Sequence, residues 1–355
     1  AGAFAGSPVQ PGCMCAFAPY DIENVKAVGY DVVTNRPKVA AYRAPGAPIS
    51  EYAVESAVDE LALKLDMDPV DLRLMNAAKE GTRAAYGPKF GPIGYVKILE
   101  EAKDLEQYST PLGPNQGRGV ASGFWFNIGG ETCAALQLNV DGTLNLMIGT
   151  PDVGGSRASM ALMAAETLGV DYDDVRPIIG DTSSLGYTFL TGGSLATFSS
   201  GMAVVQASED IITKACARAA KVWEIDEDAV NWENGLIKPS GPNAGDFEPM
   251  TLADIAKHAN KTGGPISGFA QINAQGAAPS FGAHVVDVEV DPETGKVDIL
   301  RYTVLQDAGK AVHPDYVEGQ FQGGAAQGVG WALNEEYIYN DKGQMENTGF
   351  LDYRI

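Results

Sequence analysis

Three pairs of strand-like segments, each pair joined by a turn, constrain the fold of this chain more than any other feature. β-Branched and aromatic residues flank turn sequences such as Asp141-Gly142, a pattern that is typical of antiparallel hairpins. The pairs are 30–34 with 38–42, 134–140 with 144–148, and 284–290 with 296–306. Apolar residues recur at helical spacing between the pairs. The sequence therefore predicts an α+β fold, with mixed sheets and hairpins packed on helices, rather than a doubly wound parallel sheet.

The remaining elements follow from helix caps and apolar periodicity. Ser50 fits the N-cap of a helix that runs to about residue 65, and Asp68 followed by Pro69 predicts the start of a short second helix. Further helices are expected at 157–168, 197–220 and 314–333, and further strands at 175–179, 337–339 and 350–355. Residues 80–118 are rich in glycine, proline and polar groups. We therefore expect a boundary there between two domains, at residues 1–112 and 113–355.

The charge and the cysteine content exclude several functional classes. The formal net charge is −21, and a chain this acidic repels nucleic acid. The four cysteines lack the usual zinc or redox spacing, so we expect reduced thiols in a cytoplasmic protein. The three histidines are far apart, no apolar run approaches the length of a membrane span, and no signal peptide is visible. We expect no nucleic-acid partner, no membrane span and no metal ligated directly by the protein.

Three loops place small residues just before an expected helix. Free backbone N–H groups at such a position bind anions, and a nearby arginine strengthens the site. The loops are 42–48, 151–157 and 191–194. Each loop alone is more simply an ordinary turn into a helix, and none matches the P-loop or the dinucleotide-binding glycine pattern. Together, the three loops favour a bound ligand that carries phosphate.

A glycine- and glutamine-rich segment is a further candidate. Gln320 and Gln327 are two helical turns apart and share a face, and glutamine can both donate hydrogen bonds to a heteroaromatic ligand and accept them from it. Close helix packing through the small residues is the simpler explanation from spacing alone. The aromatic run Phe124-Trp125-Phe126 is interpreted as core, with a substrate wall as the alternative. No hydrolase motif of the Gly-x-Ser-x-Gly type is present.

The order of the motifs along the chain resembles the molybdopterin-binding subunit of the xanthine dehydrogenase and aldehyde oxidase family. Each motif is weak alone, whereas their common order is specific to the family. The resemblance rests on residues 41–48 and 59–62, 68–76, 149–155 and 164–170, 180–182 and 191–194, and 291–295, 307–309 and 319–330. It implies that residues 1–112 form the C-terminal part of a first molybdopterin-binding domain. Residues 113–355 would form a second such domain that is incomplete at its C-terminus.

The resemblance also implies which residues bind the cofactor and the substrate. The pterin carries the molybdenum through its dithiolene, so the protein needs no direct metal ligand. Cofactor binding is expected at ten residues of the loops and the glutamine-rich helix: Arg43, Ala44, Gly154, Gly155, Ser156, Gly192, Gly193, Ser194, Gln320 and Gln327. Pro45, Phe124 and Trp125 would line the substrate pocket.

The implied reaction needs partners. Members of the family hydroxylate an aldehyde or an N-heteroaromatic substrate with water as the oxygen source. Electrons then leave through two [2Fe-2S] clusters to FAD. These centres are expected on a [2Fe-2S] subunit and an FAD-binding subunit, in a dimer of heteromers located in the cytoplasm. Bacterial members commonly carry molybdopterin cytosine dinucleotide, whose phosphates suit the three loops.

The chain departs from the family pattern at several positions. The family's base is a glutamate that we expect beyond Ile355, so no catalytic residue is assigned in this chain. We also expect the remainder of the subunit to be missing at both ends, since Ala1 is not a methionine, and the isolated fragment to be inactive. Many relatives have glutamine at the position of Gly155 and arginine at that of Leu195, and Pro45 replaces an aromatic residue of xanthine-type members.

These departures keep a second hypothesis open beside the enzyme. The chain could be a degenerate or isolated non-catalytic module that keeps the fold and the partner surface. A plain dinucleotide-binding oxidoreductase is poorly supported, because no Gly-x-Gly-x-x-Gly motif follows a strand.

Overall fold

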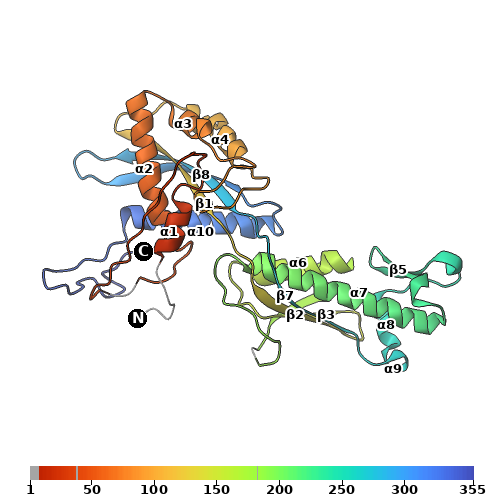
Figure 1. Cartoon of the computed structure of the whole chain (residues 1–355). Coiled ribbons are helices and arrows are strands. Elements are labelled where there is room, and N and C mark those ends of the chain that lie inside the picture. The colour runs from red at the N-terminus through yellow and green to blue at the C-terminus, as the bar shows by residue number, and fades with distance from the viewer. Residues whose placement is uncertain (1–7, 37–38, 182) are drawn as a thin grey trace. The chain divides into compact units, whose positions relative to one another are not determined.

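The computed structural model describes residues 8–36, 39–181 and 183–355, which fall into two compact units (Figure 1). Unit 1 contains residues 1–126, 278–310 and 318–355, and unit 2 contains residues 127–277 and 311–317. Both units combine antiparallel strands with helices, which confirms the α+β prediction. Unit 1 is discontinuous in sequence because the chain leaves it after Phe126 and returns at Ala278.

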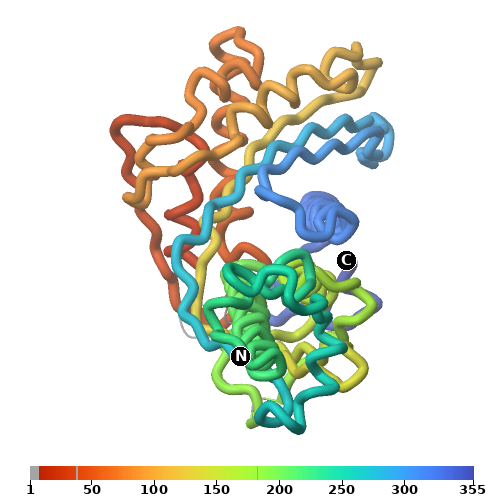
Figure 2. Tube along the Cα trace, turned by 90° about the vertical axis from the view of Figure 1, so that its right-hand side faces the viewer, coloured from red at the N-terminus to blue at the C-terminus, as the bar shows by residue number. Residues whose placement is uncertain are grey.

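Unit 1 is built on a three-stranded antiparallel sheet in the order β1-β8-β9. The strands are β1 (Gln116–Trp125), β8 (Ser280–Val290) and β9 (Val297–Asp307). Figure 2 shows β1 (yellow) running beside β8 (cyan) along its whole length, although more than 150 residues separate them in the sequence. Arg118 on β1 donates to both carboxylate oxygens of Asp287 on β8, at 2.6 and 2.9 Å, and so fixes the register of this pair.

Five helices belong to the N-terminal part of unit 1. They are α1 (Val9–Cys15), α2 (Ala47–Leu65), α3 (Pro69–Met75), α4 (Tyr95–Asp104) and α5 (Glu106–Ser109). One face of the sheet packs on these helices, because Val120, Phe124 and Phe281 share a core with Tyr95 and Leu99. The segment 80–118, expected to be a boundary rich in turns, therefore contains a core helix.

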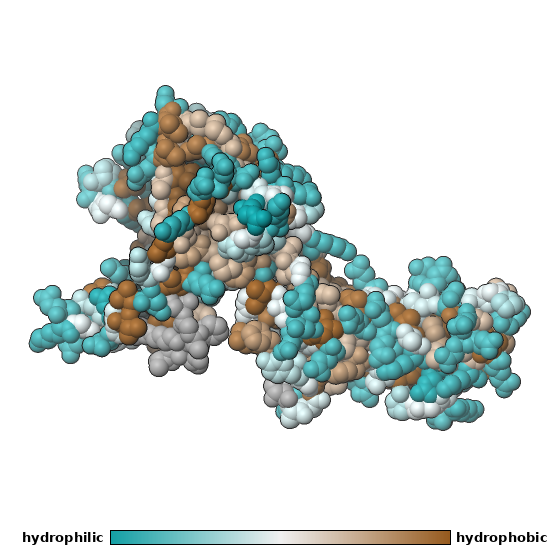
Figure 3. All heavy atoms as spheres, viewed as in Figure 1, coloured by the Kyte–Doolittle hydropathy of each residue, from teal (hydrophilic) through white to brown (hydrophobic). Residues whose placement is uncertain are grey.

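The outer face of α2 remains apolar. Tyr52 and Leu63 are 76% and 83% exposed, and Figure 3 shows hydrophobic residues gathered along this helix on the face of the molecule that it displays. A hollow beside the helix is lined by Val58, Leu61 and Leu72, among other residues.

Unit 2 is built on a four-stranded mixed sheet in the order β4-β3-β2-β7. The strands are β2 (Glu131–Leu138), β3 (Leu144–Ile148), β4 (Val175–Ile179) and β7 (Ser267–Asn273), of which β3 and β4 pair in parallel. Two long helices pack on the sheet: α6 (Ser156–Leu168) and α7 (Gly201–Trp223) (Figure 1). The contact face of α7 presents Ala203, Ala207 and Ile211 at helical spacing, and these small residues allow a close approach to β7.

The remaining elements of unit 2 are short. They are the hairpin β5 (Val230–Glu233) and β6 (Leu236–Pro239), the helices α8 (Leu252–Lys257) and α9 (Ala259–Thr262), the 3-10 turns η1 (Tyr172–Asp174), η3 (Glu227–Ala229) and η4 (Gly241–Asn243), and the π-helical turn η2 (Ala196–Ser200). Helix α10 (Pro314–Leu333) begins in unit 2 and continues in unit 1. No helix in the described ranges is long and apolar enough to cross a membrane.

Four expected strands do not form in the described residues. Residues 30–34 and 39–42 form no strand, and residues 37–38 of the expected hairpin lie outside the described residues. Val33 is 94% exposed, so a strand there would have no surface to cover. The C-terminal segment 350–355 also forms no strand, with Phe350 and Leu351 fully exposed. Between 337 and 339, only Tyr339 makes a bridge, to Met345. The strand predictions for 30–34, 337–339 and 350–355 are wrong, as is the prediction for 38–42 over its described part, 39–42.

The two compact units do not test the predicted domain boundary at residue 112. The units describe how the chain packs, whereas the domains 1–112 and 113–355 were expected from the composition of residues 80–118 and from a family resemblance. That division stays a prediction.

Candidate functional site

The first of the three loops leads into α2 in unit 1, and its backbone conformation requires small residues. Ala44 and Gly46 have φ angles of 52° and 83°, in the left-handed region. A Cβ on Gly46 would lie 2.1 Å from the carbonyl oxygen of Pro8. Ala47 and Pro48 then begin the helix. The loop is thus pressed against the N-terminal segment of unit 1, and no side chain fits at position 46.

Arg43 of this loop lies against the glycine-rich part of α10. Its Nη2 donates to the carbonyl oxygen of Gln320 at 2.9 Å. A Cβ on Gly323 or Gly324 would lie 3.7 or 3.5 Å from the guanidinium group, so these glycines leave room for the arginine. The Gln327 side chain donates to the Tyr42 hydroxyl at 2.8 Å. The structure therefore brings three of the expected cofactor residues together: Arg43, Gln320 and Gln327.

The aromatic run at the end of β1 divides between core and surface. Phe124 is only 4% exposed and packs against Phe90 and Phe281, with ring centroids 5.8 and 5.0 Å away. It is a core residue, so its expected place in the substrate pocket is not supported. Trp125 is partly exposed and stacks on Phe126 at 4.3 Å. Its buried Nε1 has no partner among the described residues. Pro45 is partly buried in the first loop.

The second loop leads into α6 in unit 2. Gly154 and Gly155 have φ angles of 60° and 79°. Ser156 is buried, and its hydroxyl joins the loop to itself by accepting from the amide of Val153 at 3.2 Å and donating to Pro151 at 3.3 Å. The amides of Gly154 and Gly155 donate to no acceptor within the described part of the chain. The serine side chain is therefore structural, whereas the two glycine amides remain available to a ligand.

The third loop lies beside the second one. The hydroxyls of Thr150 and Thr191 are 3.0 Å apart and connect the two loops. Gly193 and Ser194 have φ angles of 67° and 64°, and the π-helical turn η2 follows. Among the residues that the structure describes, the amides of Gly192, Gly193 and Ser194 have no acceptor. π-Helical turns are frequent at functional sites, and here the turn connects a loop with unpaired amides to α7.

The two changes from the family pattern in unit 2 have different surroundings. Leu195 is 1% exposed and belongs to the core, so its side chain points away from the loop surface. Gly155 faces Tyr316, the third residue of α10. A Cβ on Gly155 would lie 2.4 Å from Cδ2 of the tyrosine ring. Tyr316 in turn stacks on His313, with ring centroids 3.9 Å apart. Neither aromatic residue was singled out from the sequence, because no spacing rule connects them to Gly155.

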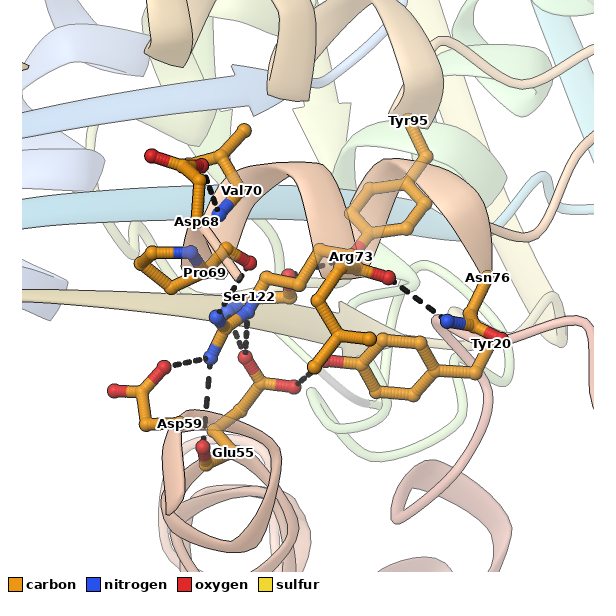
Figure 4. Close-up of polar contacts among 11 residues, drawn as sticks. Tyr20, Glu55, Asp59, Asp68, Pro69, Val70, Arg73, Asn76, Tyr95 and Ser122 are labelled. Carbon is orange, nitrogen blue, oxygen red and sulfur yellow. Dashed lines mark hydrogen bonds and ion pairs between the residues drawn. The ribbon is translucent and has the colours of Figure 1, made fainter. Parts of the chain in front are cut away.

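A buried cluster of charges stands behind the first loop (Figure 4). Arg73 on α3 is fully buried, and its Nε donates to Glu55 on α2 at 2.8 Å, while its Nη2 contacts Asp59 at 2.8 Å. Glu55 also accepts from the amide of Ser122 at 2.6 Å and from the hydroxyl of Tyr20. Burial opposes the charge on Arg73, but the neighbouring carboxylates raise its pKa above the ordinary value. The cluster ties α2 to α3 and β1, and so holds the start of α2 in place.

The cluster has a partner one turn earlier on α2. Glu51 accepts from the amide of Phe124 at 3.0 Å. Burial raises the pKa of Glu51 well above its ordinary value, and this effect exceeds that of the amide, which favours the charged form. The sequence offered only the spacing of Glu51, Glu55 and Asp59 on one helix face as a signal. In the described ranges, no group of three or more His, Cys, Asp or Glu residues is arranged to hold a metal ion.

Comparison with known proteins identifies the family. The chain matches the molybdopterin cofactor-binding domain over residues 1–77 and again over residues 95–355. It is 33% identical, over 91% of its length, to the xanthine dehydrogenase molybdenum-binding subunit of Escherichia coli O157:H7, and covers 45% of that protein. The chain thus spans about half the length of the curated relatives it matches.

Solved structures agree with the fold. Quinoline 2-oxidoreductase from Pseudomonas putida 86 superimposes with a TM-score of 0.84 at 22% identity, over 98% of this chain and 48% of that one. The aldehyde oxidoreductase from Desulfovibrio desulfuricans ATCC 27774 does so with a TM-score of 0.72 at 26% identity, over 93% of this chain and 36% of that one. The order of loops and helices and these matches lead to one conclusion: the chain belongs to the molybdopterin-binding subunits of the xanthine dehydrogenase family of molybdenum oxidoreductases.

Proposed function

We propose that the chain is the cofactor-binding part of a molybdenum hydroxylase that oxidises an aldehyde or an N-heteroaromatic substrate with water as the oxygen source. The family match over residues 95–355 carries this proposal. The names of the relatives support both substrate classes, because xanthine and quinoline are N-heteroaromatic and another relative oxidises aldehydes. When bound, the molybdenum cofactor supplies the redox chemistry of this reaction.

The described residues fit such a cofactor. The amides of five glycine and serine residues in the second and third loops lack acceptors in the described part of the chain, and amides grouped before a helix bind phosphate or other anionic groups. We propose that the amides of these residues bind the cofactor: Gly154, Gly155, Gly192, Gly193 and Ser194. Four of the five residues have positive φ angles, and four of the five are glycines, which carry no side chain.

In unit 1, we propose that Arg43, Ala44, Gln320 and Gln327 contribute to cofactor binding. Arg43 keeps several N–H groups beyond the one that it donates to Gln320, so it can still bind an anionic oxygen. Pro45 and Trp125 are the remaining candidates for the substrate pocket, and the unpartnered Nε1 of Trp125 could donate to a substrate atom. Ser156 contributes through its backbone, because its hydroxyl is used within the loop.

The wider assembly is part of the proposal. We propose molybdopterin cytosine dinucleotide as the form of the cofactor, because its phosphates match the amide-rich loops. FAD and two [2Fe-2S] clusters would be carried by partner subunits in a dimer of heteromers in the cytoplasm. A degenerate, non-catalytic module is the second candidate. It is favoured by the ring of Tyr316, which occupies the side-chain space at position 155.

The test is the metal and pterin content of the subunit purified with its natural partners. We expect about one molybdenum and one pterin per copy. The Gly154→Ala variant should lose at least about tenfold of both, because a Cβ would project from the loop whose amides bind the cofactor. Gly295→Ala is the matched control: its φ of 71° resembles the 60° of Gly154, so the backbone strain is similar, and no atom lies within 4 Å of its Cβ position. Active material without molybdenum or pterin would refute the proposal.

A further inference from the structure

The side-chain space at position 155 is filled by another residue of the same unit. Three ring atoms of Tyr316 lie 2.4 to 2.7 Å from the position of a Cβ on Gly155, far inside normal van der Waals contact. The φ of Gly155 is 79°, so glycine is favoured there for conformational reasons as well. No residue with a side chain can occupy position 155 while the tyrosine ring stays in place. Gly155 and Tyr316 therefore form a coupled pair.

The tyrosine ring is held from its other side by His313. The two rings stack with centroids 3.9 Å apart and an interplanar angle of 21°. His313 immediately precedes Pro314 at the start of α10, so a short, rigid stretch of backbone carries both rings. Stacking and helix geometry fix the tyrosine ring above the second loop rather than leaving it free in solvent. A ring that is held in this way loses little conformational entropy when it contacts a ligand.

Polar atoms that the protein itself does not use gather at this point. Nδ1 of His313 is buried and has no hydrogen-bond partner among the described residues. The Tyr316 hydroxyl also makes no hydrogen bond within the described ranges, and the side chain is 41% exposed. The ring lies against the Cβ position of Gly155, whose amide, like that of Gly154, has no acceptor in the described part of the chain. Buried polar atoms usually have partners, so the unpartnered Nδ1 of His313 indicates a ligand nearby, and the exposed hydroxyl of Tyr316 is free to donate to it.

We propose that Tyr316, supported by His313, is a ligand-contact residue that takes the place of a side chain at position 155 and donates its phenolic hydrogen to an acceptor atom of the bound ligand. This inference rests on the proposed function. The acceptor belongs either to the cofactor or to the substrate, for example a ring nitrogen or a carbonyl oxygen. Both have the same hydrogen-bonding chemistry, and the experiment separates them.

The first arm of the experiment tests the coupling between the two positions in the full subunit with its partners. Gly155→Gln should lower the midpoint of thermal unfolding and the molybdenum content, because the new side chain collides with the ring. Tyr316→Ala removes the ring, so the double variant Gly155→Gln with Tyr316→Ala should regain at least half of the lost unfolding midpoint. Effects that simply add in the double variant would overturn the inference, because the ring would not be what fills the space.

The second arm tests the hydroxyl. Tyr316→Phe keeps the ring and the stacking on His313, and we expect an unchanged unfolding midpoint. If the acceptor belongs to the substrate, KM should rise about tenfold with unchanged cofactor content, as expected for one lost hydrogen bond. If it belongs to the cofactor, the pterin and molybdenum content should fall instead. Tyr172→Phe is the control. Tyr172 lies in unit 2 and is 42% exposed, much like Tyr316, but it lies just before the first residue of β4, away from the second loop.

Two results would count against the inference in different ways. If Tyr316→Phe matches Tyr172→Phe in KM, kcat and cofactor content, the hydroxyl contacts no ligand and the inference fails, while the proposed function stands. If the unchanged subunit contains neither molybdenum nor pterin, the proposed function fails, and the inference that rests on it fails as well.

Discussion

Glu51 is an acidic residue whose charged form is disfavoured by its surroundings. Its carboxyl group packs beside β1 and accepts a hydrogen bond from the amide of Phe124, yet burial raises its pKa well above the ordinary 4.5. In the unfolded chain, the same carboxyl ionises at the ordinary value. Above that pH, unfolding therefore releases a proton, and the contribution of Glu51 to stability falls as the pH rises toward the pKa in the folded state.

The pH dependence of Glu51 leads to a direct prediction. Glu51→Gln keeps an acceptor for the amide of Phe124 but cannot ionise, so the variant should gain stability relative to the unchanged protein as the pH rises from 5 to 8. The slope of the unfolding midpoint against pH should shift in the positive direction over the same range, because the negative contribution of Glu51 is removed. Glu60→Gln, at an exposed position of the same helix, is the control and should leave the slope unchanged. A slope that is unchanged or shifted in the negative direction for Glu51→Gln would contradict the raised pKa of this carboxyl.

The position of helix α2 depends on charges rather than on apolar packing alone. Its outer face leaves Tyr52 and Leu63 exposed, while its inner face carries Glu55 to Arg73 on α3 and to the amide of Ser122 on β1. Breaking a buried ion pair costs more than the pair contributes, because the remaining charge has no partner. The first loop begins α2, so a weakened cluster would disturb Arg43 as well.

Removal of the guanidinium group should show the cost of the unpaired carboxylate. Arg73→Met is expected to lower the free energy of unfolding by about 3–5 kcal/mol, measured by urea denaturation. Adding Glu55→Gln should recover part of this loss, because the stranded charge is removed. Lys97→Met breaks an exposed pair with Glu101 at 3.6 Å and should change the stability by less than about 1 kcal/mol. Equal losses for Arg73→Met and Lys97→Met would mean that the cluster is not buried in solution.

Periodicity predicted well the elements that carry their own signal. Strand β4 and helix α10 have the expected bounds, and the two hairpins at 134–148 and 284–306 form as β2–β3 and β8–β9. Sequence patterns failed where contacts with other parts of the chain determine the local structure. Residues 30–34 have strand composition but no partner in the described residues, and α4 lies in a segment whose glycines and prolines suggested only turns. Strand pairing is a property of two segments, and composition reports on only one of them.

The candidate site shows the same limit. The loops could be found because glycine marks positive φ angles, as at Gly46 and Gly155. The ring of Tyr316 could not be found, because its contact with Gly155 joins positions 161 residues apart in the sequence. The loops by themselves predicted only a ligand that carries phosphate. The prediction of a molybdenum cofactor came from the resemblance to the family. Ser156 was rightly placed in the second loop, but its hydroxyl supports the loop itself.

The net charge of −21 acts on the whole molecule. Like charges spread over the surface repel one another and destabilise compact states. Salt shortens the range of this repulsion, to about 10 Å at 0.1 M. We expect the midpoint of thermal unfolding to rise by roughly 2–4 °C between 0.01 and 0.3 M NaCl, corresponding to about 1 kcal/mol. Sucrose at equal osmolality controls for effects on water activity. A falling midpoint would mean that surface ion pairs outweigh the general repulsion.

The discontinuity of unit 1 governs the order in which the protein can fold as it is synthesised. Strand β1 is complete at Trp125, but its partner β8 begins only at Ser280. All four strands of the unit 2 sheet lie between residues 131 and 273, so that sheet has its full set of strands before the ribosome has made β8. The nascent chain therefore carries β1 without its partner β8 while residues 127–277 of unit 2 are made. An unpaired strand is a template for association with other chains, so β1 is open to such association while the chain between Trp125 and Ser280 is made.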